Sequence, residues 1–360
     1  MIGNIFRWRW SLAAAAFLIL LAGCAPSGQS EPAETSRLNV VATTTFVGDA
    51  VRRVAGEEVN LTVLLAPGQN PHAYQSTPRD LVRVSDADLV FANGLGLEEF
   101  LDDLLEGAEN QEALVVVSQQ ISPLEMEADD HTHGGGDDHD QEDHDGEHKD
   151  GEHHDGEDHD GEHHDGEEHD GEHHDGEDHE GEHHHQGQDP HVWFDPNNVM
   201  LWVEVISETL SEADPQHAEL YRQNAENYRA EMQELDSWIR EQVATIPEEN
   251  RELVTDHASF GYFAQEYGFE QIGAVIPAPT TEAETSGQQL AALMRTIEEH
   301  QVKAVFVSKD IDPSLAERVA EDTGVELVPL YFGSLTGGEP AENYLDFMRY
   351  NVEAVVSALK

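Results

Sequence analysis

The chain has almost no cysteine and few basic residues, and both shortages limit the kinds of site and partner that it can have. Among 360 residues there is one Cys, Cys24, so no intrachain disulfide can form and no thiolate site for a metal is expected. Lys and Arg number 18 against 75 Asp and Glu, which gives a formal charge of -57. This charge disfavours binding to nucleic acid or to an anionic lipid surface. Cations are the expected partners, and a metal site here must use nitrogen and oxygen ligands.

The chain also lacks sequence signatures of catalytic and transport machinery. It contains no P-loop and no G-x-S-x-G, and beyond the N-terminus it has no apolar run long enough to span a membrane. We therefore expect neither an ATPase nor a permease within this chain, and we do not expect an enzyme.

The N-terminus has the pattern of a secretory signal. Arg7 and Arg9 precede the apolar run "SLAAAAFLILLAG", and Cys24 follows it. The four residues ending at Cys24, "LAGC", resemble a bacterial lipobox, in which the cysteine receives diacylglycerol and becomes the first residue of the mature protein. We expect a signal peptide over 1–23 and a lipidated, flexible tether over 24–37. An ordinary signal peptide with an unmodified Cys is the alternative.

Short β-rich runs alternate with helical segments in two parts of the chain, and this predicts two α/β lobes with mainly parallel sheets. The N-terminal lobe covers 38–213 and the C-terminal lobe covers 248–360. In the first we expect strands at 38–45, 59–65, 87–93 and 113–118, and helices at 46–55, 78–86 and 97–108. In the second we expect strands at 252–256, 302–308 and 325–330, and helices at 260–267, 286–300 and 313–323.

One long helix is expected between the lobes, over 214–247. Asp214 is its predicted N-cap, Pro215 takes the first helical position and Pro247 ends the helix. Its apolar residues recur every three or four positions: Tyr221, Ala225, Tyr228, Met232, Leu235, Ile239 and Val243. The helix is either an ordinary core helix or a rigid strut that limits how far the lobes can swing.

Most of the histidines, 17 of 22, lie in one acidic tract at 129–186 that has no aliphatic or aromatic side chain. Because nothing there can be buried to offset the entropy cost of ordering, we expect a disordered insertion in the first lobe. Its imidazoles should bind several metal ions weakly, and a solvated spacer is the alternative. The adjacent histidines are the candidates for this auxiliary binding: His153, His154, His163, His164, His173, His174, His183, His184 and His185.

Three of the five histidines outside the tract lie where α/β sheets place their ligands. His72 lies just beyond a predicted strand, and His257 lies at the corresponding point of the second lobe. His191 lies in a turn between two prolines, before a helix. His217 and His300 stand beside glutamates and are expected to be solvated.

Four segments resemble, in order and context, the metal-binding lipoproteins that feed bacterial ABC importers of zinc and manganese. They are "PGQNPHAYQSTPRD", "DPHVWFDPNN", "DHASFGYFAQEYGF" and "ENYLDFMRYNV". The resemblance extends from about residue 38 to the C-terminus, and a His-rich insertion ahead of the second segment resembles the zinc-type members. It implies two four-stranded α/β lobes joined by one long rigid helix, with the metal in the cleft between them.

The motif matches imply that His72, His191 and His257 are metal ligands. Manganese-type members usually have a glutamate at the third position. Three imidazoles suit tetrahedral Zn(II), whereas Mn(II) prefers more oxygen, so zinc is the expected cargo. The family's fourth ligand is often an Asp or Glu from the second lobe. Here Gly333 or a neighbour stands where an Asp is expected, and Ser308 stands where another acid is expected. Asp310, two residues after Ser308, or water is the candidate substitute, with Asp312 a further alternative.

A metal-bound histidine usually has its other ring nitrogen held by an acceptor. Asp195 and Asp256 are near enough in sequence to His191 and His257 to be candidates for this role. Either could instead cap a helix.

The leading hypothesis is an extracytoplasmic, lipid-anchored protein that captures Zn(II) with high affinity and delivers it to an ABC permease and its ATPase. We expect a monomer without nucleic-acid partners. The alternatives are a carrier of manganese or another divalent metal, and a surface metal buffer or adhesin that acts through the tract. A zinc hydrolase with an open fourth position is a further hypothesis, but no general base accompanies the three histidine motifs.

Overall fold

Two four-stranded parallel sheets form the centre of the described structure. The structure is a computed structural model that describes residues 37–125 and 187–360. Cys24 and the tract at 129–186 lie outside the described residues. Leu38–Lys360 form one compact unit. None of the helices in the described ranges combines the length and apolar character needed to cross a bilayer.

The two sheets have the same strand order. In the first lobe the order is β2-β1-β3-β4, and in the second it is β6-β5-β7-β8, with all neighbours parallel. The first sheet consists of β1 (Leu38–Ala42), β2 (Val59–Val63), β3 (Leu89–Ala92) and β4 (Leu114–Val116). The second consists of β5 (Glu252–His257), β6 (Glu270–Ile276), β7 (Ala304–Ser308) and β8 (Glu326–Leu330). The predicted α/β class and the pair of lobes are confirmed.

Helices cover both faces of each sheet, as continuous apolar strands require. Beside the first sheet lie α1 (Thr45–Ala55), α2 (Pro78–Ser85), α3 (Leu101–Ala108) and α4 (Pro196–Ala213). Beside the second lie α6 (Gly261–Tyr267), α7 (Gly287–His300), α8 (Ser314–Thr323) and α9 (Tyr344–Leu359). Alternate residues of β1 face opposite cores: Val40 and Ala42 join one cluster, and Val41 joins another with α2 and α3.

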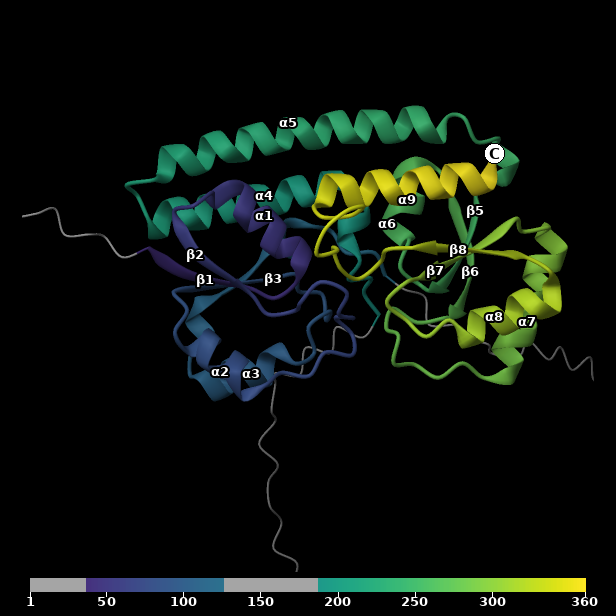
Figure 1. The fold of residues 1–360 in the computed structure, drawn as a ribbon, viewed down its shortest axis with the longest axis horizontal. Coiled ribbons are helices and arrows are strands. Elements are labelled where there is room, and N and C mark those ends of the chain that lie inside the picture. The colour runs from purple at the N-terminus through teal and green to yellow at the C-terminus, as the bar shows by residue number, and fades with distance from the viewer. Residues whose placement is uncertain (1–36, 126–186) are drawn as a thin grey trace, which may run out of the picture. The chain divides into compact units, whose positions relative to one another are not determined.

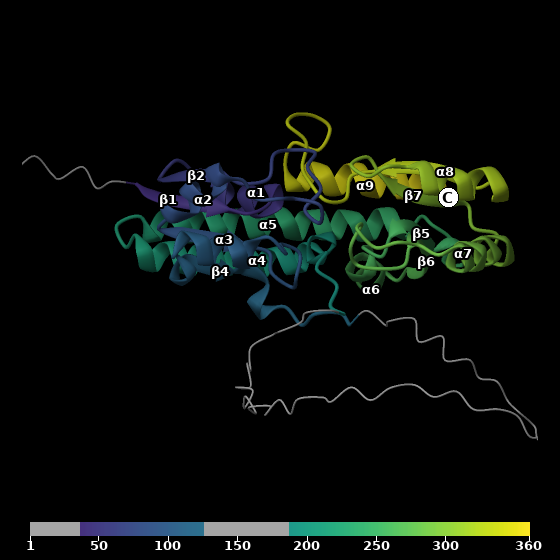
Figure 2. The same cartoon turned by 90° about the horizontal axis from the view of Figure 1, so that it is seen from below.

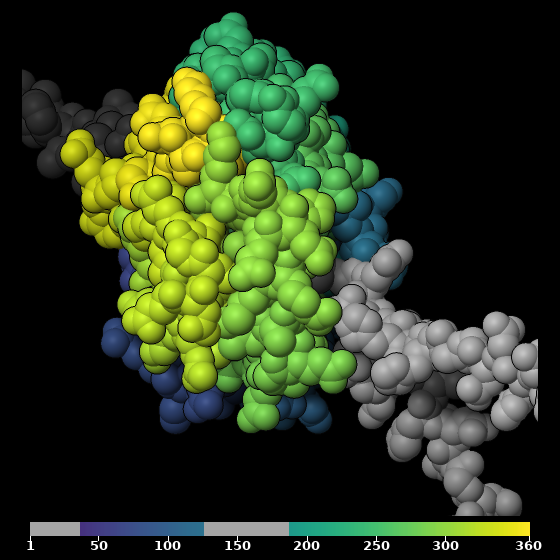
Figure 3. All heavy atoms as spheres, turned by 90° about the vertical axis from the view of Figure 1, so that its right-hand side faces the viewer, coloured from purple at the N-terminus to yellow at the C-terminus, as the bar shows by residue number. Residues whose placement is uncertain are grey.

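The long helix α5 (Ala218–Val243) runs over both lobes (Figure 1). Its 26 residues span about 39 Å, and all seven apolar positions predicted to face inward are buried. They belong to a single apolar cluster that also contains Val40 of the first sheet and Phe306 of the second. Figure 2 shows α4 and α9 alongside α5, and Figure 3 shows the ends of α5 and α9 together on the second lobe. The lobes therefore share one core.

The start of the linking helix differs from the prediction. Asp214 is the C-cap of α4, and α5 begins at Ala218, so the predicted N-cap at Asp214 is wrong. The Asp214 carboxylate accepts a hydrogen bond from the Tyr221 hydroxyl at 2.8 Å and lies 2.6 Å from His217 Nδ1. These contacts hold the turn between two antiparallel helices.

Local sequence patterns did not predict β6 and α9, and they indicated a helix after His191, which is α4, without giving its bounds. β6 is an edge strand with mostly half-buried residues, so its apolar pattern is weak. α4 and α9 are each buried against α5 on one side.

Candidate metal centre

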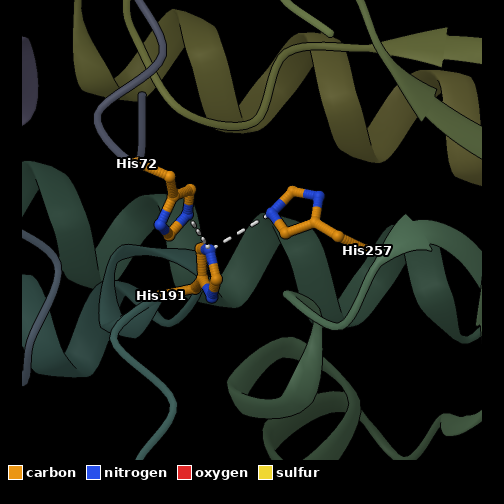
Figure 4. A group of neighbouring side chains, drawn as sticks. All are labelled: His72, His191 and His257. Atoms are coloured by element: carbon orange, nitrogen blue, oxygen red, sulfur yellow. Dashed lines mark hydrogen bonds between the residues drawn. The ribbon is translucent and has the colours of Figure 1, made fainter. Parts of the chain in front are cut away.

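The three histidines expected from their loops converge on one point in the structure (Figure 4). His72 lies in the loop between β2 and α2, His191 precedes a short 3-10 helix (Val192–Phe194), and His257 is the last residue of β5. Each offers a ring nitrogen, and these nitrogens all lie within 4.8 Å of one another. Residues from the chain's two lobes are thus brought together at the end of a central strand, where α/β sheets place their ligands.

The spacing of the nitrogens suits a shared cation. His191 Nε2 lies 3.2 Å from His72 Nε2 and 3.2 Å from His257 Nε2. Two nitrogens bound to one zinc ion at about 2.0–2.1 Å with a tetrahedral angle are about 3.3 Å apart. The described side chains could therefore hold one ion with little rearrangement.

Two carboxylates orient two of the rings. Asp189 Oδ1 lies 2.7 Å from His191 Nδ1, and Asp256 Oδ1 lies 2.7 Å from His257 Nδ1. A carboxylate accepts the Nδ1 proton, so the Nε2 atom of each ring is left with its lone pair facing the shared point. Unshared lone pairs at this separation repel, which is the arrangement that a cation relieves.

Asp256 and Asp195 were both predicted as candidates for this role. Asp256 does hold His257, but His191 is held by Asp189 and not by Asp195. Asp195 instead caps α4 by accepting the Asn197 N–H at 2.8 Å. Asp189, two residues before His191, also accepts the His191 backbone N–H at 2.9 Å. The acid in the "DPH" turn was the available sequence signal for this partner.

The site is largely buried. His191 and His257 are 1% and 2% exposed, and the rings of Trp193 and Phe332 pack against them. Burial, followed by the neighbouring imidazoles, lowers the pKa of His72 and His191 well below the usual value for histidine. The neutral form that binds metals is therefore favoured at these two residues.

A cavity of about 10 Å³ lies at the centre of the cluster, roughly the space of one water molecule. Besides the three histidines, its walls are Asn70, Thr281, Ser308, Asp310, Ile311, Phe332 and Gly333. This volume suits a single small ion.

Two wall residues bear on the fourth coordination position. A Cβ placed on Gly333 would lie 2.8 Å from Pro71 Cδ, so a side chain cannot be added there without moving the His72 loop. Asp310 lines the same cavity, and its Oδ2 is buried without a hydrogen-bond partner among the described residues. Its carboxylate does not, however, lie within the 4.8 Å group that the three histidines form.

The remaining candidates lie elsewhere. Asp312 is on the surface and binds Ser314. His217 lies beside Asp214, and His300 Nδ1 lies 3.0 Å from Glu252. Cys24 and the nine tract histidines lie outside the described residues.

Known proteins resemble this chain along nearly its whole length. Residues 40–358 match the ZnuA family, described as the periplasmic component A of zinc-uptake complexes. The chain is 32% identical over 343 residues to the manganese-binding lipoprotein MntA of Halalkalibacterium halodurans, which covers 95% of both chains. It is 27% identical over 351 residues to the iron-binding protein YfeA of Yersinia pestis, covering 95% of this chain and 94% of the other.

Solved structures agree on the fold. The periplasmic zinc-binding protein TroA of Treponema pallidum superposes with a TM-score of 0.70 at 24% identity, covering 90% of this chain and 99% of the other. The relatives include proteins named for zinc, manganese and iron, so family membership alone leaves the metal open. The chain belongs to the ZnuA family, the metal-binding substrate-binding proteins of ABC transporters.

Proposed function

We propose that this protein binds Zn(II) with high affinity outside the cytoplasm and delivers it to an ABC permease driven by its ATPase. The observation that carries the proposal is the convergence of three Nε2 atoms, from His72, His191 and His257, on one buried point. Such a site binds and releases an ion and needs no chemical step. A lipid on Cys24 holds the protein at the membrane as a monomer.

Zinc is favoured by the donor set. Three imidazoles leave one position of a tetrahedral zinc ion, which Asp310 or water fills. Mn(II) prefers more oxygen ligands, and no carboxylate belongs to the group that the described histidines form. The names of MntA relatives make manganese the second candidate.

The tract at 129–186 is proposed to collect metal weakly for this site. Its 17 histidines are interspersed with acids, and donors in a segment without apolar side chains bind ions at an entropy cost. The cluster of three histidines is the tight site.

The choice between zinc and manganese is tested with His257→Glu. Any site of nitrogen and oxygen donors binds zinc more tightly than manganese, so the informative quantity is the change in the ratio of the two dissociation constants. We expect the glutamate to weaken zinc binding and to shift the ratio toward manganese by about tenfold or more. Competition dialysis with metal analysis gives both constants. An unchanged ratio in His257→Glu would contradict a role of the third imidazole in the preference for zinc.

A further inference from the structure

The three histidines differ in how firmly they are held. Asp189 holds His191, and Asp256 holds His257, each through Nδ1 at 2.7 Å. In the part of the chain that the structure describes, no hydrogen bond is found at Nδ1 of His72. His72 is also half-buried, whereas the other two are fully buried. It is therefore the ligand most easily displaced.

The loop that carries His72 lies between two segments of the second lobe. On one side the Gly68 N–H donates to Ser334 Oγ at 2.7 Å, and Pro71 packs against Gly333. On the other side the Asn70 side-chain amide donates to Thr281 Oγ1 at 2.8 Å. Both Asn70 and Thr281 form walls of the metal cavity.

Asn70 joins this contact to the ligand itself. Its Oδ1 accepts the backbone N–H of His72 at 3.0 Å, while its amide group reaches Thr281. One side chain thus fixes the backbone of the His72 ligand and ties it to the opposite lobe.

The Thr281 segment, 277–285, is held to its own lobe near both ends. The Ala278 carbonyl accepts the Ala258 N–H, and the Thr285 hydroxyl donates to the Val275 carbonyl. Between these points, the bond from Asn70 is the one hydrogen bond to the first lobe found within the described ranges. Without it, no hydrogen bond among the described residues would hold the segment over the cavity.

We propose that Asn70 is a positioning residue and that the Asn70–Thr281 hydrogen bond sets the rate at which a bound ion leaves. The proposal rests on the proposed function of the three histidines. When the bond breaks, the His72 ligand and the 277–285 segment are no longer joined over the cavity, so the His72 ring can leave the ion, while Gly68 still binds Ser334 and His191 and His257 stay held by their carboxylates. The ion then has two protein ligands instead of three, and water can replace the third. Metal release requires the opening of this contact and leaves the shared core of the lobes intact.

The test is the rate of zinc dissociation from the full-length chain with Thr281→Val. The substitution keeps the shape of the side chain and removes the acceptor. Protein loaded with one equivalent of zinc is mixed with excess chelator in a stopped-flow instrument. We expect dissociation roughly three- to tenfold faster than in the wild type, the effect of losing one hydrogen bond. Thr280→Val is the matched control, since the Thr280 hydroxyl bonds within its own segment, to Glu282, and should leave the rate unchanged.

A double-mutant cycle with Asn70→Ala identifies the bond itself. In the Asn70→Ala background, Thr281→Val should accelerate dissociation no further, because the partner is already absent. Thermal unfolding of the metal-free variants checks that each is folded. A wild-type dissociation rate in Thr281→Val, or equal acceleration in Thr280→Val, would overturn the proposal. His72→Ala distinguishes the proposed metal site from the proposed role of Asn70. If His72→Ala abolishes tight binding while Thr281→Val has no effect, the three histidines form the site but the Asn70–Thr281 bond does not control metal release.

Discussion

At the scale of single residues, two carboxylates orient rings of the histidine cluster from the side away from the point where the three rings meet. Asp256 touches His257 through Oδ1, and its Oδ2 accepts the N–H of Ser308 at the end of β7. It therefore fixes the ring and also joins two strand ends. Such partners of ligating histidines raise the basicity of the ligand and hold its orientation.

Replacing Asp256 with Asn should weaken zinc binding by about 10- to 100-fold, because the amide keeps the size of the group and loses its charge. The dissociation constant is measured by competition with a chelator. Asp312→Asn is the control. It makes the same change at an acid that lies on the surface and does not line the metal cavity. Equal affinity of Asp256→Asn and the wild type would show that the carboxylate has no part in binding.

The three histidines could be predicted from sequence, whereas only one of their partners could. Each histidine lies in a motif after a strand or in a turn, and backbone topology brings these positions together. The choice of Asp189 over Asp195 depends on which way a side chain points in the turn before α4. The departure at Gly333 was visible in the sequence, but its physical reason, the close approach of Pro71, required coordinates.

At the scale of elements, helix α4 begins under an unusual cap. Asp195 is 8% exposed and accepts two bonds from Asn197, one from its backbone and one from its side chain. Burial raises the pKa of Asp195 to about 6, and the acids Glu266 and Asp236 contribute. The ionised form that caps the helix is thus disfavoured by its surroundings.

This cap gives a pH-dependent stability with a defined sign. The folded-state pKa is higher than that of the unfolded chain, so the native state binds more protons between about pH 4 and pH 6. The wild type should therefore lose stability as pH rises through this window, by on the order of 2–3 kcal/mol from this group. Asp195→Asn, which stays neutral and can still cap, should lack this loss.

Urea unfolding of both metal-free proteins at several pH values measures the difference. We expect the two to have similar stability at pH 4, and the variant to gain relative to the wild type up to pH 7. A difference that stays constant across the range would contradict the raised pKa of Asp195.

Most elements could be predicted from local patterns, and the exceptions have physical reasons. The seven apolar residues of α5 recur with helical spacing, so its buried face was evident. Asp214 followed by Pro215 has the pattern of a helix start, yet the Asp214 backbone N–H donates to the Leu210 carbonyl and ends α4. Its side chain contacts His217 and Tyr221 at the start of α5. An edge strand such as β6 buries too little to leave a clear pattern.

At the scale of the whole molecule, one apolar core continues beneath α5 from the first sheet to the second. Additional contacts cross between the lobes: Trp193 Nε1 donates to the Phe332 carbonyl, and the Tyr344 hydroxyl donates to the Trp193 carbonyl. Wide hinge motion would expose this core. Movement of loops at the cavity is therefore the expected means of metal exchange.

The residues that flank the His-rich tract lie side by side. Glu125 and Gln188 form an isolated antiparallel bridge, and the Asp189 N–H donates to the Leu124 carbonyl. The Tyr262 hydroxyl accepts the Leu124 N–H and donates to the Asp189 carbonyl. Both flanks are thus fixed by the folded part of the chain, so removing 129–186 should leave the position of His191 unchanged.

The most direct test of the central claim is a zinc titration of three proteins: the full chain, the chain without 129–186, and full-length His72→Ala. Calorimetry with a competing chelator separates the tight site from weaker binding. The cluster of three histidines predicts one tight zinc ion in the first two proteins, and its loss or great weakening in His72→Ala. Loss of all tight binding on deletion of the tract, or wild-type affinity in His72→Ala, would contradict the account.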